Sequence, residues 1–199
     1  MEIVVATKNL NKVREIGSIL SQFGMTAISR DDAGIPDFNI EETGTTFEEN
    51  SFIKADSIRQ YTTKAVIADD SGLEVDFLNG APGVYSARYA DVDGENADAA
   101  NNKKLLKELK DVPAGERRAR FVSVITILFP DGRKIAAKGT CEGTVAEELM
   151  GDNGFGYDPL FIPDGHEQSF AQLHPDEKNK ISHRGKALGK LKEKLKENE

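Results

Sequence analysis

Two adjacent carboxylates, Asp69 and Asp70, have the clearest capacity for chemistry in this chain. They follow the apolar run 65–68, which predicts a short buried strand, and they precede Ser71 and Gly72. Adjacent carboxylates beside a buried strand repel one another and lose hydration unless a cation or hydrogen-bond donors compensate. A divalent metal ion is the simplest compensation, although Asp-Ser-Gly also commonly forms a plain structural turn.

A second acidic pair, Glu41 and Glu42, lies in a loop that ends near Gly44. Hard oxygen ligands of this kind suit magnesium or manganese better than zinc, whereas the alternative is a pair of solvated loop acids. Lys54 follows on a helix that is predicted over residues 47–61, after this loop. Its apolar neighbours leave open whether its ammonium faces a ligand or the solvent.

The junction between the first predicted strand and the first predicted helix is polar. Hydroxyl, amide and ammonium groups there lie beside a helix N-terminus, where unpaired N–H groups and the helix dipole favour an anion. This junction predicts a phosphate cradle, and the alternative is an N-cap by Asn9 with two surface lysines. No Walker loop is present in the chain. The residues of the junction are Thr7, Lys8, Asn9, Leu10, Asn11 and Lys12.

Two later segments offer groups that suit a planar ring. The first segment, residues 155–158, combines two aromatic rings with flexible backbone. The alternative is that these rings simply fill the hydrophobic core at a Gly-rich turn. The second segment, around residues 183–184, offers hydrogen-bond donors that can bind the carbonyl edge of such a ring. The alternative is that it forms the ordinary start of a helix. Together with the phosphate cradle and the acids, they indicate a nucleotide as the ligand. The residues are Phe155, Gly156, Tyr157 and Asp158 in the first segment, and His183 and Arg184, with Lys178 nearby, in the second.

The elements that must position these residues alternate between strand and helix in the first part of the chain. Strands are expected at 3–6, 26–29 and 65–68, and helices after residue 9 and over 47–61. Thr46 and Glu49 match a capping box at the start of the second helix. Another short strand is expected over 73–77. This order favours a mixed α/β sheet with ligands at the strand ends.

The second part of the chain predicts a helix over 97–109, a long hairpin built from 121–129 and 134–145, a strand over 160–162 and a terminal helix. No internal repeat or low-complexity linker divides the chain. We therefore expect one domain over residues 1–199, made of two lobes around a nucleotide-binding cleft.

Composition excludes several classes of protein. Hydrophobic residues make up 38% and charged residues 30% of 199 residues, which are globular proportions. Cys141 is the only cysteine, so neither an intramolecular disulfide nor a cysteine-cluster zinc site can form. A net charge of −8 argues against a nucleic-acid partner, although residues 178–199 are basic. No apolar stretch approaches membrane-spanning length, and the N-terminus lacks a signal-peptide pattern, so we expect a soluble cytoplasmic protein without a membrane partner.

An ordered series of motifs resembles the inosine triphosphate pyrophosphatase family. The motifs extend from Thr7 to Gly185, nearly the whole chain, which makes the resemblance highly specific. They are T-x-N-x-x-K at 7–12, E-E-T-G-x-T-F-x-E-N at 41–50, D-D-S-G at 69–72, G-A-P-G-x-Y-S-A-R-Y at 80–89, F-G-Y-D-P at 155–159 and S-H-R-G at 182–185.

The resemblance implies a hydrolase that converts non-standard purine nucleoside triphosphates, such as those of inosine, deoxyinosine and xanthosine, to monophosphate and pyrophosphate. It further implies an elongated mixed α/β fold, Mg²⁺ as cofactor and a homodimer. The implied site roles are carried over residue by residue. Thr7 to Lys12 cradle the phosphates, Glu41 and Asp70 hold Mg²⁺ with Asp69 in support, Asp70 activates water, Lys54 faces the triphosphate, Ser71 contacts the nucleotide, and Phe155 to Asp158, Lys178, His183 and Arg184 surround the base.

Three other functions compete with this one. A metal-dependent phosphatase that removes one terminal phosphate would use the same acids and lysines. A nucleotide sensor without turnover would keep the cradle and the aromatic segment but would not need both Asp69 and Asp70. A nucleic-acid-binding module would use the C-terminal lysines, and the acidity of the rest of the chain makes it the weakest of the three.

Overall fold

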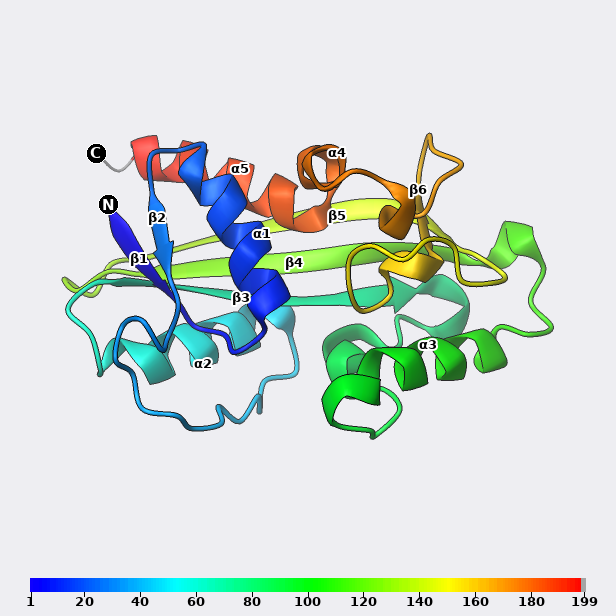
Figure 1. Cartoon of the computed structure of the whole chain (residues 1–199), viewed down its shortest axis with the longest axis horizontal. Helices are drawn as coiled ribbons and strands as arrows, with labels where there is room; N and C mark the ends of the chain where they lie inside the picture. Colours follow the sequence, from blue (N-terminus) through cyan, green and yellow to red (C-terminus); the bar gives the residue numbers. More distant parts are fainter. Residues whose placement is uncertain (198–199) are drawn as a thin grey trace. The chain divides into compact units, whose positions relative to one another are not determined.

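The computed structural model describes residues 1–197 and divides the chain into two compact units. The first unit contains residues 1–70, 123–139 and the segment from His183 onward, and the second contains residues 71–122 and 140–182. Figure 1 shows the elements of both. Each unit has its own hydrophobic core.

The chain forms six strands in one sheet, in the order β2-β1-β3-β4-β5-β6. β1 pairs in parallel with β2 and β3, and β5 pairs antiparallel with β6, so the sheet is mixed. The expectation of a mixed α/β fold is therefore confirmed. The strands are β1 (Glu2–Val5), β2 (Thr26–Ile28), β3 (Ala65–Val75), β4 (Arg118–Leu128), β5 (Lys134–Val145) and β6 (Phe161–Pro163).

In the first unit, helices connect the parallel strands because a parallel pair needs a long crossover. α1 (Leu10–Ser21) joins β1 to β2, α2 (Phe47–Arg59) precedes β3, and α5 (His183–Glu197) ends the described chain. α1 begins at its N-cap Asn9, and α2 begins at the capping box that Thr46 and Glu49 form. Both helix starts agree with the sequence patterns.

The first unit buries the two faces of its strands under different helices (Figure 1). Successive side chains of a strand point to opposite faces, so odd- and even-numbered positions separate. On β3, Ala65 and Ile67 pack with α1 and α5, whereas Val66 and Ala68 pack with α2. This alternation decides which helices can supply partners to the residues that follow on β3.

The structure corrects the expected end of this strand. The sequence predicts separate strands over 65–68 and 73–77, but a single strand, β3, continues without a break from Ala65 to Val75. Asp69 and Asp70 are both buried within it. The continuation is possible because cationic side chains compensate each carboxylate, so the chain does not need to turn these residues toward water.

The second unit packs α3 (Ala97–Glu108) and α4 (Pro175–Ile181) with its parts of β3, β4 and β5 and with β6. Its core contains Leu73, Leu105 and a cluster of three aromatic rings, Phe121, Phe161 and Phe170. The motif at 80–89 forms a 3₁₀ helix over Gly83–Arg88. The predicted hairpin strands and the helix over 97–109 are present to within a few residues.

The end of the chain also differs from expectation. Two helices, α4 and α5, replace the single terminal helix, and His183 and Arg184 lie in the first turn of α5 rather than ahead of it. Gly139 explains how α5 packs so closely, because a Cβ at this position would collide with backbone atoms of His183 and Ala187. None of the helices within residues 1–197 combines the length and the apolar character that a membrane-spanning segment needs.

Candidate active site

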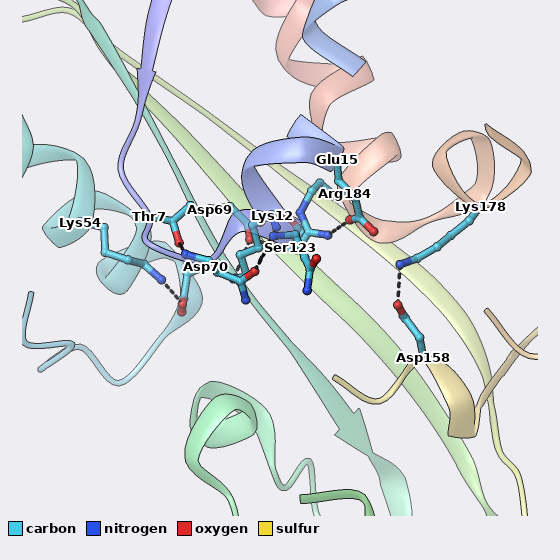
Figure 2. A network of polar contacts seen from close by, with 12 residues as sticks. Thr7, Lys12, Glu15, Lys54, Asp69, Asp70, Ser123, Asp158, Lys178 and Arg184 are labelled. Carbon is cyan, nitrogen blue, oxygen red and sulfur yellow. Dashed lines mark hydrogen bonds and ion pairs between the residues drawn. The ribbon is translucent and has the colours of Figure 1, made fainter. Parts of the chain in front are cut away.

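Asp69 is held by three side chains on one face of β3 (Figure 2). Its Oδ1 accepts a hydrogen bond from Ser123 Oγ at 2.6 Å, and its Oδ2 lies 3.1 Å from Arg184 Nη2 and 2.8 Å from Lys12 Nζ. Burial alone would raise the pKa of Asp69, but Arg184 and Lys12 outweigh it and hold this pKa well below its ordinary value. Asp69 is therefore a permanent anion at neutral pH, suited to orienting cations rather than to accepting a proton.

Arg184 is buried and joins Asp69 to helix α1. One guanidinium nitrogen donates to Asp69, and another donates to Glu15. The sequence reading placed Arg184 against the base and did not foresee these two acidic partners. Its role in reading the base stays a prediction, and the structure adds that the guanidinium is already oriented from two sides.

Asp70 lies on the other face of β3 and contacts α2 (Figure 2). Its Oδ1 accepts a hydrogen bond from Lys54 Nζ at 2.6 Å, and the same ammonium lies 3.4 Å from Glu42 Oε1. Lys54 is thus buried toward the acids and is not the surface lysine that the sequence left open. Burial raises the pKa of Asp70 despite the neighbouring lysine. Burial lowers the pKa of Lys54, but the carboxylates of Asp70 and Glu42 outweigh this and raise it.

The second oxygen of Asp70 is the most informative atom of the site. Oδ2 is buried, and no hydrogen-bond donor among the described residues reaches it. An ionised buried oxygen without a partner costs free energy, so its presence indicates a ligand that is supplied from outside. A carboxylate oxygen beside further acids is the donor type that Mg²⁺ prefers. Asp70 thus fits the expected metal, although no group of three metal-ligating side chains is assembled within residues 1–197.

The acidic loop before α2 is fixed at its C-terminal end. The N–H of Gly44 donates to Asn50 Oδ1 at 2.8 Å, and a Cβ at Gly44 would lie 2.6 Å from that oxygen. Glycine is therefore required for this close approach. The structure brings Glu42 to Lys54, whereas Glu41 is exposed on the loop. The metal role of Glu41 stays a prediction. Glu42 lies beside Lys54, although the family resemblance assigned it no role in the site.

Some polar groups of the junction before α1 already form hydrogen bonds that cap the N-terminus of this helix. Asn9 Oδ1 accepts from the N–H groups of Asn11 and Lys12, and Thr7 Oγ1 accepts from the N–H of Asn9. The N-cap interpretation of Asn9 is therefore confirmed. Thr7 and Lys12 are half-buried, and Leu10 is exposed. Lys8 forms an ion pair with Asp37 and donates to Asn39 at 3.1 Å.

The second unit holds the aromatic segment and Lys178. Lys178 Nζ donates to Asp158 Oδ2 at 2.6 Å and lies 5.2 Å from the ring centroid of Phe155 (Figure 2). Phe155 is half-buried, whereas Tyr157 is buried in the core and its hydroxyl donates to the Ser86 carbonyl at 2.9 Å. Of the two aromatic rings, Phe155 is the one that remains accessible to a ligand. Gly156 between them has φ +60°.

The expected site residues thus fall into two groups. The first unit brings Lys12, Lys54, Asp69, Asp70 and Arg184 together through ion pairs, and the buried His183 lies beside Arg184 on α5. The second unit brings Phe155, Asp158 and Lys178 together, and the half-buried Ser71 opens this unit on β3.

Sequence reasoning missed Ser123 and Glu15. Ser123 carried a usable signal, because it is a polar residue within the apolar run 121–129 that must lie buried. Glu15 carried none, since acidic residues are common on exposed helix faces. Only the contact of α1 with Arg184 distinguishes it.

The mixed sheet, with buried carboxylate and cationic groups paired on both faces of β3, defines an α/β protein with a charged interior site. More specifically, the chain belongs to the Ham1 family, whose model matches residues 3–194. The match spans all the motifs on which the resemblance was based. The resemblance to inosine triphosphate pyrophosphatases is thereby confirmed at the level of family.

Curated relatives and solved structures agree with this assignment. A dITP/XTP pyrophosphatase of Clostridium perfringens is 51% identical, with 98% of this chain and 97% of the relative covered. The dITP/XTP pyrophosphatase of Bacillus cereus strain ATCC 14579 is 50% identical over 98% of this chain and 95% of its own length. The structure of the Staphylococcus aureus Ham1 protein matches over 100% of both chains, with a TM-score of 0.84 and 44% identity.

Proposed function

We propose that this protein is a nucleoside triphosphate pyrophosphatase that acts on the triphosphates of deoxyinosine, inosine and xanthosine. It releases the nucleoside monophosphate and pyrophosphate and so removes non-standard purines from the nucleotide pool. The proposal is supported by relatives named dITP/XTP pyrophosphatases at about 50% identity over nearly the whole chain. The single structural observation that carries it is the buried Asp70 carboxylate, which Lys54 orients through one oxygen while the other lacks a donor.

Asp70 is the proposed base that takes a proton from the attacking water. Burial raises its pKa, which makes it a stronger base than an exposed aspartate, and Lys54 orients the carboxylate by donating to Oδ1. The water attacks the α-phosphorus, the bond from that phosphorus to the bridging oxygen breaks, and pyrophosphate leaves. Asp69 supports this step by holding Lys12 and Arg184 in place.

Mg²⁺ is the proposed cofactor, with Asp70 and Glu41 as its protein ligands. When bound, it supplies positive charge that neutralises phosphate oxygens and the developing charge on the leaving group. Lys54 and the junction Thr7 to Lys12 add further cations and donors for the triphosphate. Lys54 is also close enough to Glu42 to keep the acidic loop near Asp70.

The base is proposed to contact Phe155 by stacking and to be read by Lys178, His183 and Arg184, with Gly156, Tyr157 and Asp158 completing the segment. A carbonyl at purine position 6 accepts hydrogen bonds from such donors. The amino group of adenine would place donor against donor and leave buried groups unpaired, which can cost on the order of 10³-fold in kcat/KM or more. A cytoplasmic homodimer remains the expected state of the protein.

The experiment is to incubate the protein and Mg²⁺ with a panel of triphosphates and to resolve the products. We expect inosine, deoxyinosine and xanthosine triphosphates to yield monophosphate and pyrophosphate, with loss of activity in a chelator and recovery with added Mg²⁺. Orthophosphate and a diphosphate as first products would instead identify a terminal phosphatase. A rate that is insensitive to the chelator would remove the metal role of Asp70 and Glu41.

A further inference from the structure

Helix α3 reaches the aromatic segment at one residue from two sides. The carboxylate of Asp98 accepts a hydrogen bond from the N–H of Gly156 at 2.7 Å, and Asn102 Nδ2 donates to the carbonyl of Gly156 at 2.9 Å. Asp98 and Asn102 lie four residues apart, so they project from the same face of the helix. All three residues belong to the second unit.

These two bonds fix both peptide planes that flank Gly156. The N–H belongs to the peptide shared with Phe155, and the carbonyl belongs to the peptide shared with Tyr157. Gly156 has φ +60°, a conformation that glycine leaves easily because it has no side chain. Without the two anchors, the N–H and the carbonyl of Gly156 would lose their contacts with α3, and the backbone next to Phe155 would be less restricted.

The neighbouring contacts hold the rest of the segment. The N–H of Phe155 donates to Asp158 Oδ2 at 2.9 Å, and Lys178 donates to the same oxygen. The Tyr157 hydroxyl donates to the carbonyl of Ser86. The N–H of Asp158 also donates to the Phe155 carbonyl at 3.2 Å, so Phe155 has anchors of its own. Helix α3 supplies the partners of the Gly156 N–H and of the Gly156 carbonyl.

Core stability alone does not explain Asn102. Its Nδ2 is committed to Gly156, but its Oδ1 is buried and no donor in the described chain reaches it. A buried acceptor without a partner costs free energy, so an apolar residue would serve packing better. The amide is instead suited to holding a backbone carbonyl in place.

We propose that Asp98 and Asn102 are positioning residues that set the orientation of Phe155 for base binding, an inference that rests on the proposed function. They touch neither the phosphates nor the base, and act only through the backbone of Gly156. The consequence is specific: losing either residue weakens binding of the base without altering the phosphate-binding residues of the first unit.

The test compares Asp98→Ala and Asn102→Ala with Asp98→Asn, which keeps an acceptor for the Gly156 N–H, and with Lys103→Ala, an exposed residue of the same helix. Steady-state rates with deoxyinosine triphosphate give KM and kcat. Inorganic tripolyphosphate, which has the phosphates but no base, serves as a competitive inhibitor. Hydrogen exchange of the segment 151–160 reports its backbone order.

We expect each alanine variant to raise KM about five-fold, the effect of one hydrogen bond, with kcat changed less than two-fold. The inhibition constant of tripolyphosphate stays at the wild-type value, exchange in 151–160 accelerates, and Asp98→Asn and Lys103→Ala resemble wild type. An unchanged KM in both alanine variants would overturn the inference, as would an equal weakening of tripolyphosphate. If wild type does not hydrolyse the triphosphate, the proposed function fails, whereas unchanged exchange at 151–160 refutes the positioning role by itself.

Discussion

Asp69 and Asp70 are neighbours in sequence, yet their carboxylates lie on opposite faces of β3 and have separate cationic partners. Asp69 contacts Lys12 of α1 and Arg184 of α5, whereas Asp70 contacts Lys54 of α2. Alternation along the strand produces this separation. One carboxylate has a lowered pKa and the other a raised pKa, so two identical side chains acquire different chemistry.

Replacing Asp70 by asparagine should remove most of the activity. Asp70→Asn keeps an acceptor for Lys54 but removes the base and the proposed metal ligand, so kcat should fall by roughly 10²-fold or more. Steady-state kinetics measure the loss, and near-UV circular dichroism verifies the fold. A folded variant with turnover near wild type would refute the role of Asp70.

Lys54→Met should reduce kcat while keeping the apolar stem of the side chain. The substitution removes a buried ammonium that orients Asp70 and is proposed to face the triphosphate. Loss of one such electrostatic group should lower kcat by about 10²-fold. Lys64→Met is the matched control, because Lys64 is an exposed lysine that pairs with Glu2 at 2.8 Å. Equal activity of the two variants would show that Lys54 has no part in the reaction.

Asp69→Asn should destabilise the protein in a pH-dependent way. Because folding lowers the pKa of Asp69, its contribution is fully present above its ordinary pKa of 3.8 and is lost as pH falls further toward the lower folded value. Removing one member of a buried ion pair costs about 3–5 kcal/mol of unfolding free energy. Urea unfolding in EDTA at pH 7, 5 and 3 measures this. If the difference in unfolding free energy between the variant and wild type does not decrease from pH 5 to pH 3, the assignment is contradicted.

Arg184→Ala should narrow the preference for 6-oxo purines. If the guanidinium donates to the 6-carbonyl, kcat/KM falls more for inosine and xanthosine triphosphates than for adenosine triphosphate, which gains nothing from that donor. Glu15→Gln is the companion variant, because it retains an acceptor for Arg184 and should leave the preference in place. An equal fall for all three substrates would mean that Arg184 acts through Asp69 or the fold.

Phe155→Ala should raise KM and leave kcat nearly unchanged. A stacking surface binds the ground state and the transition state alike, and its loss costs about 1–3 kcal/mol per base. Tyr157→Phe is the comparison, since Tyr157 is buried and its hydroxyl bonds Ser86. A defect confined to kcat in Phe155→Ala would exclude stacking as its role.

The α/β class, most element bounds and the motifs that identify the family can be predicted from the amino-acid sequence alone. These features depend on local patterns: strand and helix periodicity, the caps at Asn9 and Thr46, and short motifs of fixed spacing. The sequence also singled out Asp69, Asp70 and Lys54 as the residues with chemical capacity. All of these features depend on residues that are close together in the sequence, so they can be recognised without knowing the tertiary structure.

The cationic partners of the acidic residues, by contrast, become visible only in the folded protein. Asp69 meets Ser123 and Arg184 across sequence separations of 54 and 115 residues, and no local pattern encodes such pairs. The prediction of two separate strands on either side of 69–72 was wrong for the same reason, because the cations that keep both carboxylates within β3 come from three different helices. The hydrogen bonds of Asp98 and Asn102 to the backbone of Gly156 likewise depend on how α3 packs within its unit.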